Sequence, residues 1–533
     1  MGLPRRTSSR RTSARTRAPG ASRTTRISSR SSCARAARTA LRAALPALAA
    51  AASPAPNILF LVADDLGFND VGFHGSKQIP TPRLDALAAD GVDLLNYHTH
   101  PVCSPSRASM LSGRHAIHHG IYMPFAQGTA YHLSLEYELL PEALRRLGYE
   151  THAVGKWHLG QNTRAALPTG RGFDSFLGYW SGAEDYFAHD CAGAYDFANN
   201  ETTAWAYDGV YSAYSFTDRA VDVVASASTP YFLYVAWQNV HWPLEVPARY
   251  LEPFGHVPAG PRRNVSGMVS ALDEAVGNVT GALKARRAYD DAVVVFVSDN
   301  GGPTNGDEGT ASNNWPLRGG KNTLYEGGTR VVGLLKAPGV AKSSASRAKL
   351  HAVDWFPTLY RFAGGGPLVL NPPLAPGDGV DSYDVLARGA PGRDELLLEA
   401  HAPGSNDTVH GEALIVGDWK FLRIGTVRPD SEAGWTRPPG QEAHPRSVVD
   451  CGAAPEPADA NATRRQCVAA PCLFDVAADP CERVDRAVEF PDVLAALDAR
   501  LDAYRATAVP PVAALGCAPV VVDGAWRPCD DVT

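Results

Sequence analysis

The chain has 533 residues, of which 45% are hydrophobic and 20% are charged, which is ordinary for a globular protein with a large main domain and a smaller one. The net charge of −6 conceals an asymmetry, because the first 42 residues carry 12 arginines and no acidic residue. The remainder holds 38 basic against 56 acidic side chains, a charge of about −18. This argues against nucleic acid as a partner, because phosphate binding needs a basic surface.

Residues 1–53 are better explained as a targeting segment than as part of a fold. The stretch 1–38 is rich in Arg, Ser and Thr and has almost nothing apolar to bury. A short apolar run at 43–52 ends in small residues, which is the pattern of a signal peptide. It is too short for a stable membrane span, which needs about 20 residues. We expect the secretory pathway, with a secreted or lysosomal (vacuolar) destination; a plastid transit peptide or a start codon placed too far upstream fits the same composition.

Apolar runs alternate with amphipathic stretches through the first 400 residues. Continuous apolar runs predict buried strands at 57–64, 149–157, 231–238 and 292–298. Apolar side chains at helical spacing predict helices at 82–91, 139–147 and 262–288. Strands that alternate with helices indicate an α/β fold, with a mostly parallel central sheet that helices cover on both faces.

Pro- and Gly-rich segments break this pattern in the C-terminal part of the chain, and we place a domain boundary near residue 395. Beyond it, strand-like pieces at 413–424 predict a hairpin with a two-residue Gly-Asp turn, and a helix is expected at 491–504. We therefore expect a main domain at 54–395. A smaller subdomain at 396–533 would contain a short antiparallel sheet and a helix.

Cysteines and glycosylation sequons favour an oxidising compartment. Six of the nine cysteines follow residue 450 and predict a disulfide-rich subdomain, with pairing left open among Cys451, Cys467, Cys472, Cys481, Cys517 and Cys529. Zinc binding by this group is disfavoured, because the spacings contain no paired C-x-x-C units. The five N-x-[ST] sequons carry less weight and lie at Asn200, Asn264, Asn278, Asn406 and Asn461.

Three of the predicted strands end in polar groups. The first ends in Asp64 and Asp65, another in a Gln-Asn-Val-His sequence that closes on His241, and the last in Asp299 and Asn300. Ligands of open α/β sheets bind beyond the carboxyl ends of the strands. Adjacent carboxylates repel unless a cation lies between them, and oxygen ligands suit Ca²⁺ or Mg²⁺ rather than zinc. Each pair alone could be a turn or a helix cap, but together they predict a metal site.

Cys103 stands just before a predicted helix, in the sequence Val-Cys-Ser-Pro-Ser-Arg. Ser104 is expected to be the N-cap residue and Pro105 to lie in the first turn. Free backbone N–H groups and the helix dipole would favour an anion there. Arg107 follows one turn later and can pair with an oxyanion through two N–H groups. A lone cysteine can also be an inert buried thiol.

These segments resemble the sulfatase family. The C-x-P-S-R sequence at 103–107 resembles the one that sulfatases present to the formylglycine-generating enzyme. Further segments match in the same order, at 57–75, 154–160, 171–179, 299–302 and 314–328. The resemblance runs from about residue 57 to 400 and continues more thinly from 473 to 504. Within the family the chain is most similar to the arylsulfatase B branch, that of N-acetylgalactosamine-4-sulfatase.

The resemblance implies an alkaline-phosphatase-like fold and hydrolysis of sulfate monoesters, with sulfated carbohydrates or aryl sulfates as substrates. It implies that Cys103 becomes formylglycine (3-oxoalanine), whose hydrate attacks a sulfate held by one Ca²⁺, with Mg²⁺ the less expected ion. The implied metal ligands are Asp64, Asp65, Cys103, Asp299 and Asn300. The implied groups around the sulfate and the leaving group are Arg107, Lys156, His158, His241 and Lys321.

The resemblance also implies proton-transfer roles. Asp299 would accept the proton of the attacking hydroxyl, and His241, with Lys321, would protonate the leaving oxygen. His158 would remove the second hydroxyl proton of the sulfated hydrate, which expels sulfate. The remaining histidines are expected to be structural or to lie at the surface, including His74, His98, His100, His118 and His119.

Two alternatives and one departure accompany this interpretation. A phosphomonoesterase or phosphonate hydrolase of the same superfamily would typically carry Ser or Thr in place of Cys103. A catalytically inactive, glycan-binding relative would be expected to lack some of the matched positions, all of which are present. Cys191 lacks the partner cysteine that similar members of the branch carry shortly after it, which leaves that disulfide and the sugar specificity open.

Overall fold

The computed structural model describes residues 55–531 apart from 229, 305–310, 367–376, 402–410, 426–433, 439–446, 454–455, 457–466 and 469. The expected targeting segment and the sequons at Asn406 and Asn461 lie outside the described residues. Residues Pro54–Thr533 form one compact unit, and the domain boundary near residue 395 stays a prediction.

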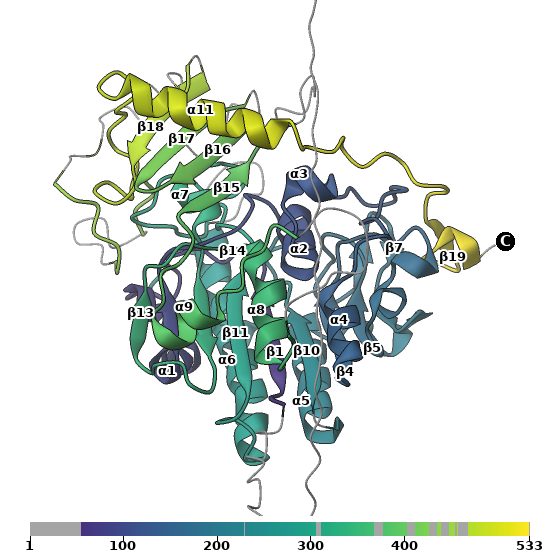
Figure 1. Ribbon diagram of the computed structural model, residues 1–533. Helices are drawn as coiled ribbons and strands as arrows, with labels where there is room; N and C mark the ends of the chain where they lie inside the picture. The colour runs from purple at the N-terminus through teal and green to yellow at the C-terminus, as the bar shows by residue number, and fades with distance from the viewer. Residues whose placement is uncertain are drawn as a thin grey trace, which may run out of the picture. The chain divides into compact units, whose positions relative to one another are not determined.

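A ten-stranded sheet forms the centre of this unit (Figure 1). Its five middle strands are parallel neighbours, in the order β11 (Val293–Ser298), β1 (Ile58–Ala63), β10 (Tyr231–Ala236), β4 (Glu150–Lys156) and β5 (Ser175–Tyr179). Shorter strands extend both edges: β12 (Gly333–Lys336), β2 (Val92–Leu94) and β13 (Ser344–Ser346) beside β11, and β8 (Ala198–Asn199) and β9 (Thr202–Thr203) beside β5. The predicted α/β class with a mostly parallel central sheet is confirmed.

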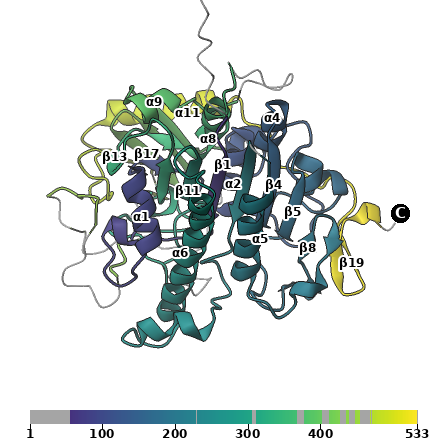
Figure 2. The ribbon, with the colours of Figure 1, turned by 90° about the horizontal axis from the view of Figure 1, so that it is seen from below.

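Side chains of β1 alternate between two hydrophobic cores, because successive residues of a strand point to opposite faces of the sheet. Leu59 and Leu61 pack in the core shared with α1 (Pro82–Asp90), α5 (Ser212–Ser226) and α6 (Pro261–Ala285). Ile58 and Phe60 pack in the core shared with α2 (Cys103–Ser112), α4 (Leu140–Arg146) and α8 (Trp355–Phe362). Figure 2 shows the sheet edge-on between these two helical layers.

The long predicted elements agree with the structure to within about three residues at their ends. The helices α5, with 15 residues, and α8, with eight, were not predicted. The other elements that were not predicted have two to six residues and are too short to show a hydrophobic period. They include β3 (Tyr97–His98), β14 (Leu350–His351), α3 (Ala116–His119), α7 (Glu326–Thr329) and α9 (Tyr383–Arg388).

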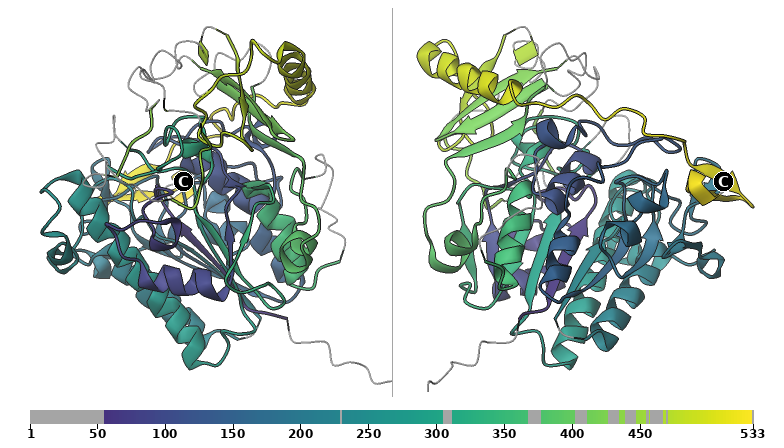
Figure 3. Two further views of the ribbon diagram at one scale, coloured as in Figure 1. Left: turned by 90° about the vertical axis from the view of Figure 1, so that its left-hand side faces the viewer. Right: turned by 45° about the vertical axis from the view of Figure 1, so that its right-hand side comes forward.

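A four-stranded antiparallel sheet forms the C-terminal part, in the order β15 (Glu395–Glu399), β16 (Gly411–Val416), β17 (Trp419–Ile424) and β18 (Cys472–Asp475). Helix α11 (Pro491–Arg505) covers it through Leu497 and Leu501, which pack with Leu397 and Phe421 (Figure 3). The predicted hairpin, with its turn at Gly417 and Asp418, and the predicted helix are confirmed.

The chain after α11 returns to the main sheet's side of the molecule (Figure 1). Backbone N–H groups of Val509 and Val512 donate to Ile117 and Gly120 around α3. The last strands, β19 (Val520–Val522) and β20 (Ala525–Arg527), form a small sheet with β6 (Asp190–Cys191) and β7 (Ala194–Tyr195).

All six C-terminal cysteines are paired, as predicted: Cys451 with Cys481, Cys467 with Cys472, and Cys517 with Cys529. Among the described residues Cys103 and Cys191 are free thiols. Within the same part of the chain, no helix is long and apolar enough to cross a membrane.

A buried charge cluster joins the antiparallel sheet to the main domain. Lys420 of β17 is fully buried, and its Nζ lies 2.9 Å from Glu326 Oε1 and 2.8 Å from Glu482 Oε1. Replacing Lys420 by methionine would leave two buried carboxylates without this cation. We expect the free energy of unfolding to fall by about 3–5 kcal/mol, measured by denaturant titration. The exposed Lys342→Met control should change it by less than about 0.5 kcal/mol.

Candidate active site

The polar residues that follow β1 and β11 lie together, because the two strands are parallel neighbours and end at the same edge of the sheet. The backbone N–H of Asp65 donates to Asp299 Oδ1 at 3.2 Å. The Asn300 amide donates to Asp65 Oδ1 at 2.6 Å. Asp65 adopts a left-handed backbone conformation, with φ of 62°, which is uncommon outside glycine and occurs frequently at functional sites.

The oxygen atoms of this group fit a divalent cation. Asp64 Oδ1 and Asn300 Oδ1 are buried and have no hydrogen-bond partner among the described residues. Burial raises the pKa of Asp299, and the neighbouring Asp64 carboxylate raises it further, while Arg107 opposes both effects. A cation between these oxygens would complete their coordination and reduce the repulsion, and the all-oxygen set suits Ca²⁺ or Mg²⁺.

Cys103 is the first residue of α2, and it is 3% exposed. The N-cap residue is Val102, so the expectation that Ser104 caps the helix is wrong. Ser104 lies inside the first turn, where its hydroxyl donates to the His158 carbonyl at 3.0 Å instead of accepting from the helix. Burial raises the pKa of the Cys103 thiol, although Lys156 and Lys321 oppose this rise. An unmodified thiol at this position would therefore be protonated and weakly nucleophilic at neutral pH.

Two cations lie between the strand ends and α2. The guanidinium of Arg107 contacts Asp299 Oδ2 at 2.8 Å and Asp64 Oδ2 at 3.6 Å. Lys156, the last residue of β4, places its Nζ 2.6 Å from Asp64 Oδ2. All four side chains are buried, so water screens these charges little.

Lys321 and His241 approach Asp65 from two other segments. Lys321 Nζ lies 2.8 Å from Asp65 Oδ2, and His241 Nε2 lies 3.8 Å from the same oxygen. His241 Nδ1 donates to the Trp242 carbonyl at 2.6 Å, which orients the ring with Nε2 toward the carboxylates.

His158 follows β4 with a φ of 56°, a second left-handed residue at the same edge of the sheet. Its Nε2 donates to the Phe125 carbonyl at 3.0 Å, whereas its Nδ1 is buried without a hydrogen-bond partner among the described residues. Burial lowers the pKa of His158 well below its ordinary value, and Lys156 lowers it further. The imidazole is therefore neutral at neutral pH, and the lone pair of the ring is on Nδ1.

The charged residues that the sequence analysis assigned to the site lie in one network of contacts, and Cys103 and His158 lie beside it. The assignment of these residues to a catalytic or metal site stays a prediction. Sequence reasoning missed the walls of the site. A small pocket beside His158 is lined by Phe125, Gln127, Tyr131, Gln161 and Trp180, among others. Trp242, next to His241, is 55% exposed. A sequence pattern could not have identified these residues, because loops bring them together.

The histidines expected to be structural make other contacts. His74 contacts Asp93, His98 contacts Glu326, His118 contacts Asp378 and His119 contacts Ser109. His100 contacts Glu399 and lies in a separate group of histidines, which is described below.

A mostly parallel sheet with clustered carboxylates, cations and a helix N-terminus at its carboxyl edge is an arrangement typical of hydrolases of anionic esters. The family model named Sulfatase matches residues 56–365, and the chain belongs to the sulfatase family. It is thus a sulfuric ester hydrolase. The chain is 37% identical over 479 residues to arylsulfatase J of Mus musculus, which covers 87% of this chain and 78% of that protein.

Further similar proteins support the assignment to the sulfatase family. Arylsulfatase A of Homo sapiens is 33% identical over 434 residues, with 73% of this chain and 80% of that protein covered. The solved structure of Ps i-CgsB superposes with a TM-score of 0.68 at 26% identity, with 86% of this chain and 94% of that chain covered. The phosphonate monoester hydrolase of Agrobacterium radiobacter, at 17% identity and a TM-score of 0.56, shares the fold. The arylsulfatase B branch stays a prediction.

Proposed function

We propose that this sulfatase removes sulfate from sulfated sugars, with Cys103, converted to formylglycine, as the nucleophile beside one Ca²⁺. The observation that carries the proposal is the position of Cys103. Cys103 begins α2 at the edge of the sheet where the carboxylates that follow β1 and β11 lie. The cations of Arg107, Lys156 and Lys321 contact these carboxylates.

The cation site would be formed by Asp64, Asp65, Asp299 and Asn300. A bound Ca²⁺ supplies Lewis-acid polarisation of a sulfate oxygen and offsets negative charge. Lys156 and Lys321 lie within 2.6–2.8 Å of these carboxylates, so their ammonium groups can reach an anion placed against the same atoms. Arg107 holds Asp64 and Asp299 in place through its guanidinium. Charge that develops on the sulfate oxygens would thus meet preorganised positive groups.

Three residues are proposed to transfer protons. Asp299, whose Oδ2 contacts Arg107 at 2.8 Å, would accept the proton of the attacking hydroxyl. His241 presents Nε2 to the site and would protonate the leaving oxygen, with Lys321 beside it. His158, neutral and with an unpaired Nδ1, would take the remaining hydroxyl proton and restore the aldehyde as sulfate leaves.

The walls of the site support a sugar as the sulfate-bearing group. The pocket beside His158 has a volume of only about 10 Å³, enough for about one water molecule, so a sugar would have to lie outside it. The exposed Trp242 offers a flat apolar face next to the proposed acid His241. One structurally similar protein, Ps i-CgsB at 25% identity, was solved in complex with k-i-k-neocarrahexaose.

Replacing Trp242 by alanine tests the sugar-binding role. We expect KM for a sulfated oligosaccharide to rise roughly 2- to 12-fold, the equivalent of about 0.5–1.5 kcal/mol of ring contact. KM for a small aryl sulfate should stay unchanged, because such a substrate has no sugar to stack. Trp205→Ala removes another half-exposed indole, which stacks on Tyr195, and serves as the control. Equal effects on both substrates would contradict the role.

We further propose maturation in the secretory pathway, where a formylglycine-generating enzyme would act on the segment around Cys103. The three disulfides support an oxidising compartment. The N-terminal composition supports a signal peptide, and a secreted or lysosomal destination follows from it.

Mass spectrometry of the peptide that contains Cys103 tests the proposal together with an activity screen. Protein from a host that makes formylglycine should show the aldehyde and should hydrolyse sulfate esters faster than phosphate or phosphonate esters. Faster turnover of phosphonate esters would favour the other hydrolase activity of this fold. A binding signal for sulfated glycans with no turnover and an unmodified thiol would indicate an inactive, glycan-binding protein.

A further inference from the structure

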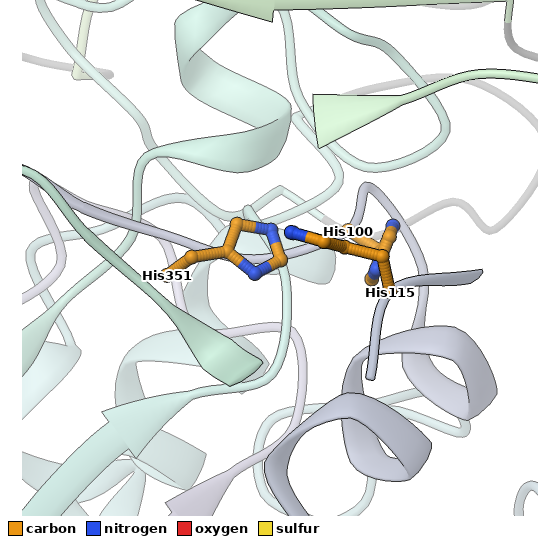
Figure 4. A group of neighbouring side chains, drawn as sticks. All are labelled: His100, His115 and His351. Atoms are coloured by element: carbon orange, nitrogen blue, oxygen red, sulfur yellow. The ribbon is translucent and has the colours of Figure 1, made fainter. Parts of the chain in front are cut away.

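Three buried histidines converge on one point outside the active site. His100, His115 and His351 are 1%, 3% and 0% exposed, and one ring atom of each, a nitrogen, lies within 4.8 Å of those of the other two. Their ring centroids are 5.2 Å apart for His100 and His351, and 4.6 Å apart for His115 and His351. Figure 4 shows the three rings gathered between segments that are distant in the sequence.

The nitrogen atoms of these rings are poorly satisfied by the protein. His115 Nδ1 and His351 Nε2 are buried and have no hydrogen-bond partner among the described residues. His351 Nδ1 and His100 Nε2 each accept one backbone N–H at the long distance of 3.4 Å. Burying an unpaired polar atom is costly, so the two unpaired nitrogens in one cluster call for a ligand that the described residues do not supply.

A carboxylate behind the cluster orients one of the rings. Glu399, the last residue of β15, places Oε2 3.3 Å from His100 Nδ1, and its other oxygen has no hydrogen-bond partner among the described residues. When Nδ1 donates to this carboxylate, the lone pair of the ring is on Nε2. Histidines that bind metal ions usually have this arrangement, in which the carboxylate fixes the tautomer and makes the imidazole more basic.

The other charges around the cluster have mixed signs. Asp378 accepts from the His115 backbone at 2.7 Å, and Asp354 accepts from the His351 backbone at 2.8 Å. Arg393 adds a positive charge near these two carboxylates. Its contact with Asp354 at 3.1 Å offsets that positive charge.

We infer that His100, His115 and His351 form a second metal site, which binds a transition-metal ion of the zinc class and is oriented by Glu399. Three imidazoles select such an ion, whereas Ca²⁺ and Mg²⁺ require oxygen ligands. With three protein ligands a tetrahedral Zn²⁺ keeps a fourth position for water or another donor. This site thus differs in chemistry from the oxygen-rich site around Asp64 and Asp65.

The position of the cluster suggests what the ion would do. His100 comes from the segment between β3 and α2, and its carbonyl accepts from Ser106 Oγ at 3.0 Å, within α2. His115 directly precedes α3, and His351 ends β14. Glu399 belongs to the antiparallel sheet. A bound ion would fix these segments to one another and hold the helix that begins at Cys103.

Metal analysis of the full-length protein tests the inference. After chelation and dialysis against Zn²⁺, the wild type should retain about one zinc ion per chain, and the His115→Gln/His351→Gln double variant should retain about a tenth of that or less. His152→Gln, which changes a histidine of β4 whose Nδ1 contacts Ser175, is the matched control and should retain zinc. Asp64→Asn should also retain it, which separates this site from the active site.

A second measurement does not depend on the folding of a variant. The wild type loaded with Co²⁺ should absorb strongly in the visible range, as four-coordinate cobalt does, whereas six-coordinate cobalt at an oxygen site absorbs weakly. Adding Zn²⁺ should bleach this absorption and raise Tm by mass action. Equal zinc retention by the wild type and the double variant would overturn the inference, and so would a wild type that shows only the weak cobalt spectrum.

Discussion

Cys103→Ala is expected to lower kcat/KM for an aryl sulfate by roughly 10⁴-fold or more. The variant lacks the side chain that would become the attacking group, while the helix N-terminus and the cations around it remain in place. Alanine fills the first position of α2 without adding volume, so the fold should be retained. The measurement is the turnover of a chromogenic sulfate ester, with circular dichroism to verify folding.

The chain contains a matched control for this prediction. Cys191 is the other free cysteine among the described residues, and it lies on the short strand β6. Cys191→Ser should keep near wild-type turnover, because this thiol contacts none of the site residues named above. Substantial turnover by Cys103→Ala would show that another group is the nucleophile and would refute the proposed mechanism.

Asp64→Asn is expected to remove both Ca²⁺ binding and most of the activity. The substitution replaces a buried carboxylate that contacts Lys156 at 2.6 Å and carries an unpaired Oδ1. Loss of a preorganised charge in a buried site typically costs about 10²–10³-fold in kcat, and loss of the ion adds to this. Lys156 would also lose its carboxylate, so we expect a lower Tm.

Calcium-dependent unfolding separates the two effects of Asp64→Asn. A ligand that binds only the folded state at about 100 times its Kd stabilises that state by about 2.7 kcal/mol. The wild type, stripped by chelation, should therefore gain Tm when Ca²⁺ is added, and the variant should not. Asp208→Asn, at an exposed position, should respond as the wild type does. An equal calcium response in Asp64→Asn would remove this residue from the proposed ligand set.

The long buried strands were predictable because their signal is local. A run such as that of β1 is apolar at every position, since both faces of a central strand are covered, and this is visible in the sequence. The sequence also predicted which residues form the site. Asp64, Asp65 and Asp299 follow predicted strands, so their meeting at one edge of the sheet follows from the α/β pattern. Cys103 and Lys321 were assigned through the sequence motifs that resemble the family.

The tertiary structure alone decided the features that depend on contacts between distant segments. Disulfide pairing, the pocket beside His158 and the exposure of Trp242 depend on loops, which carry no periodic signal. The group of His100, His115 and His351 is the clearest example. Each histidine alone resembles an ordinary buried polar residue, and only the pairing of β14 with β3 and the packing of α2 and α3 bring the rings together. Sequence specifies which groups are present, whereas chain folding specifies which of them share one buried volume.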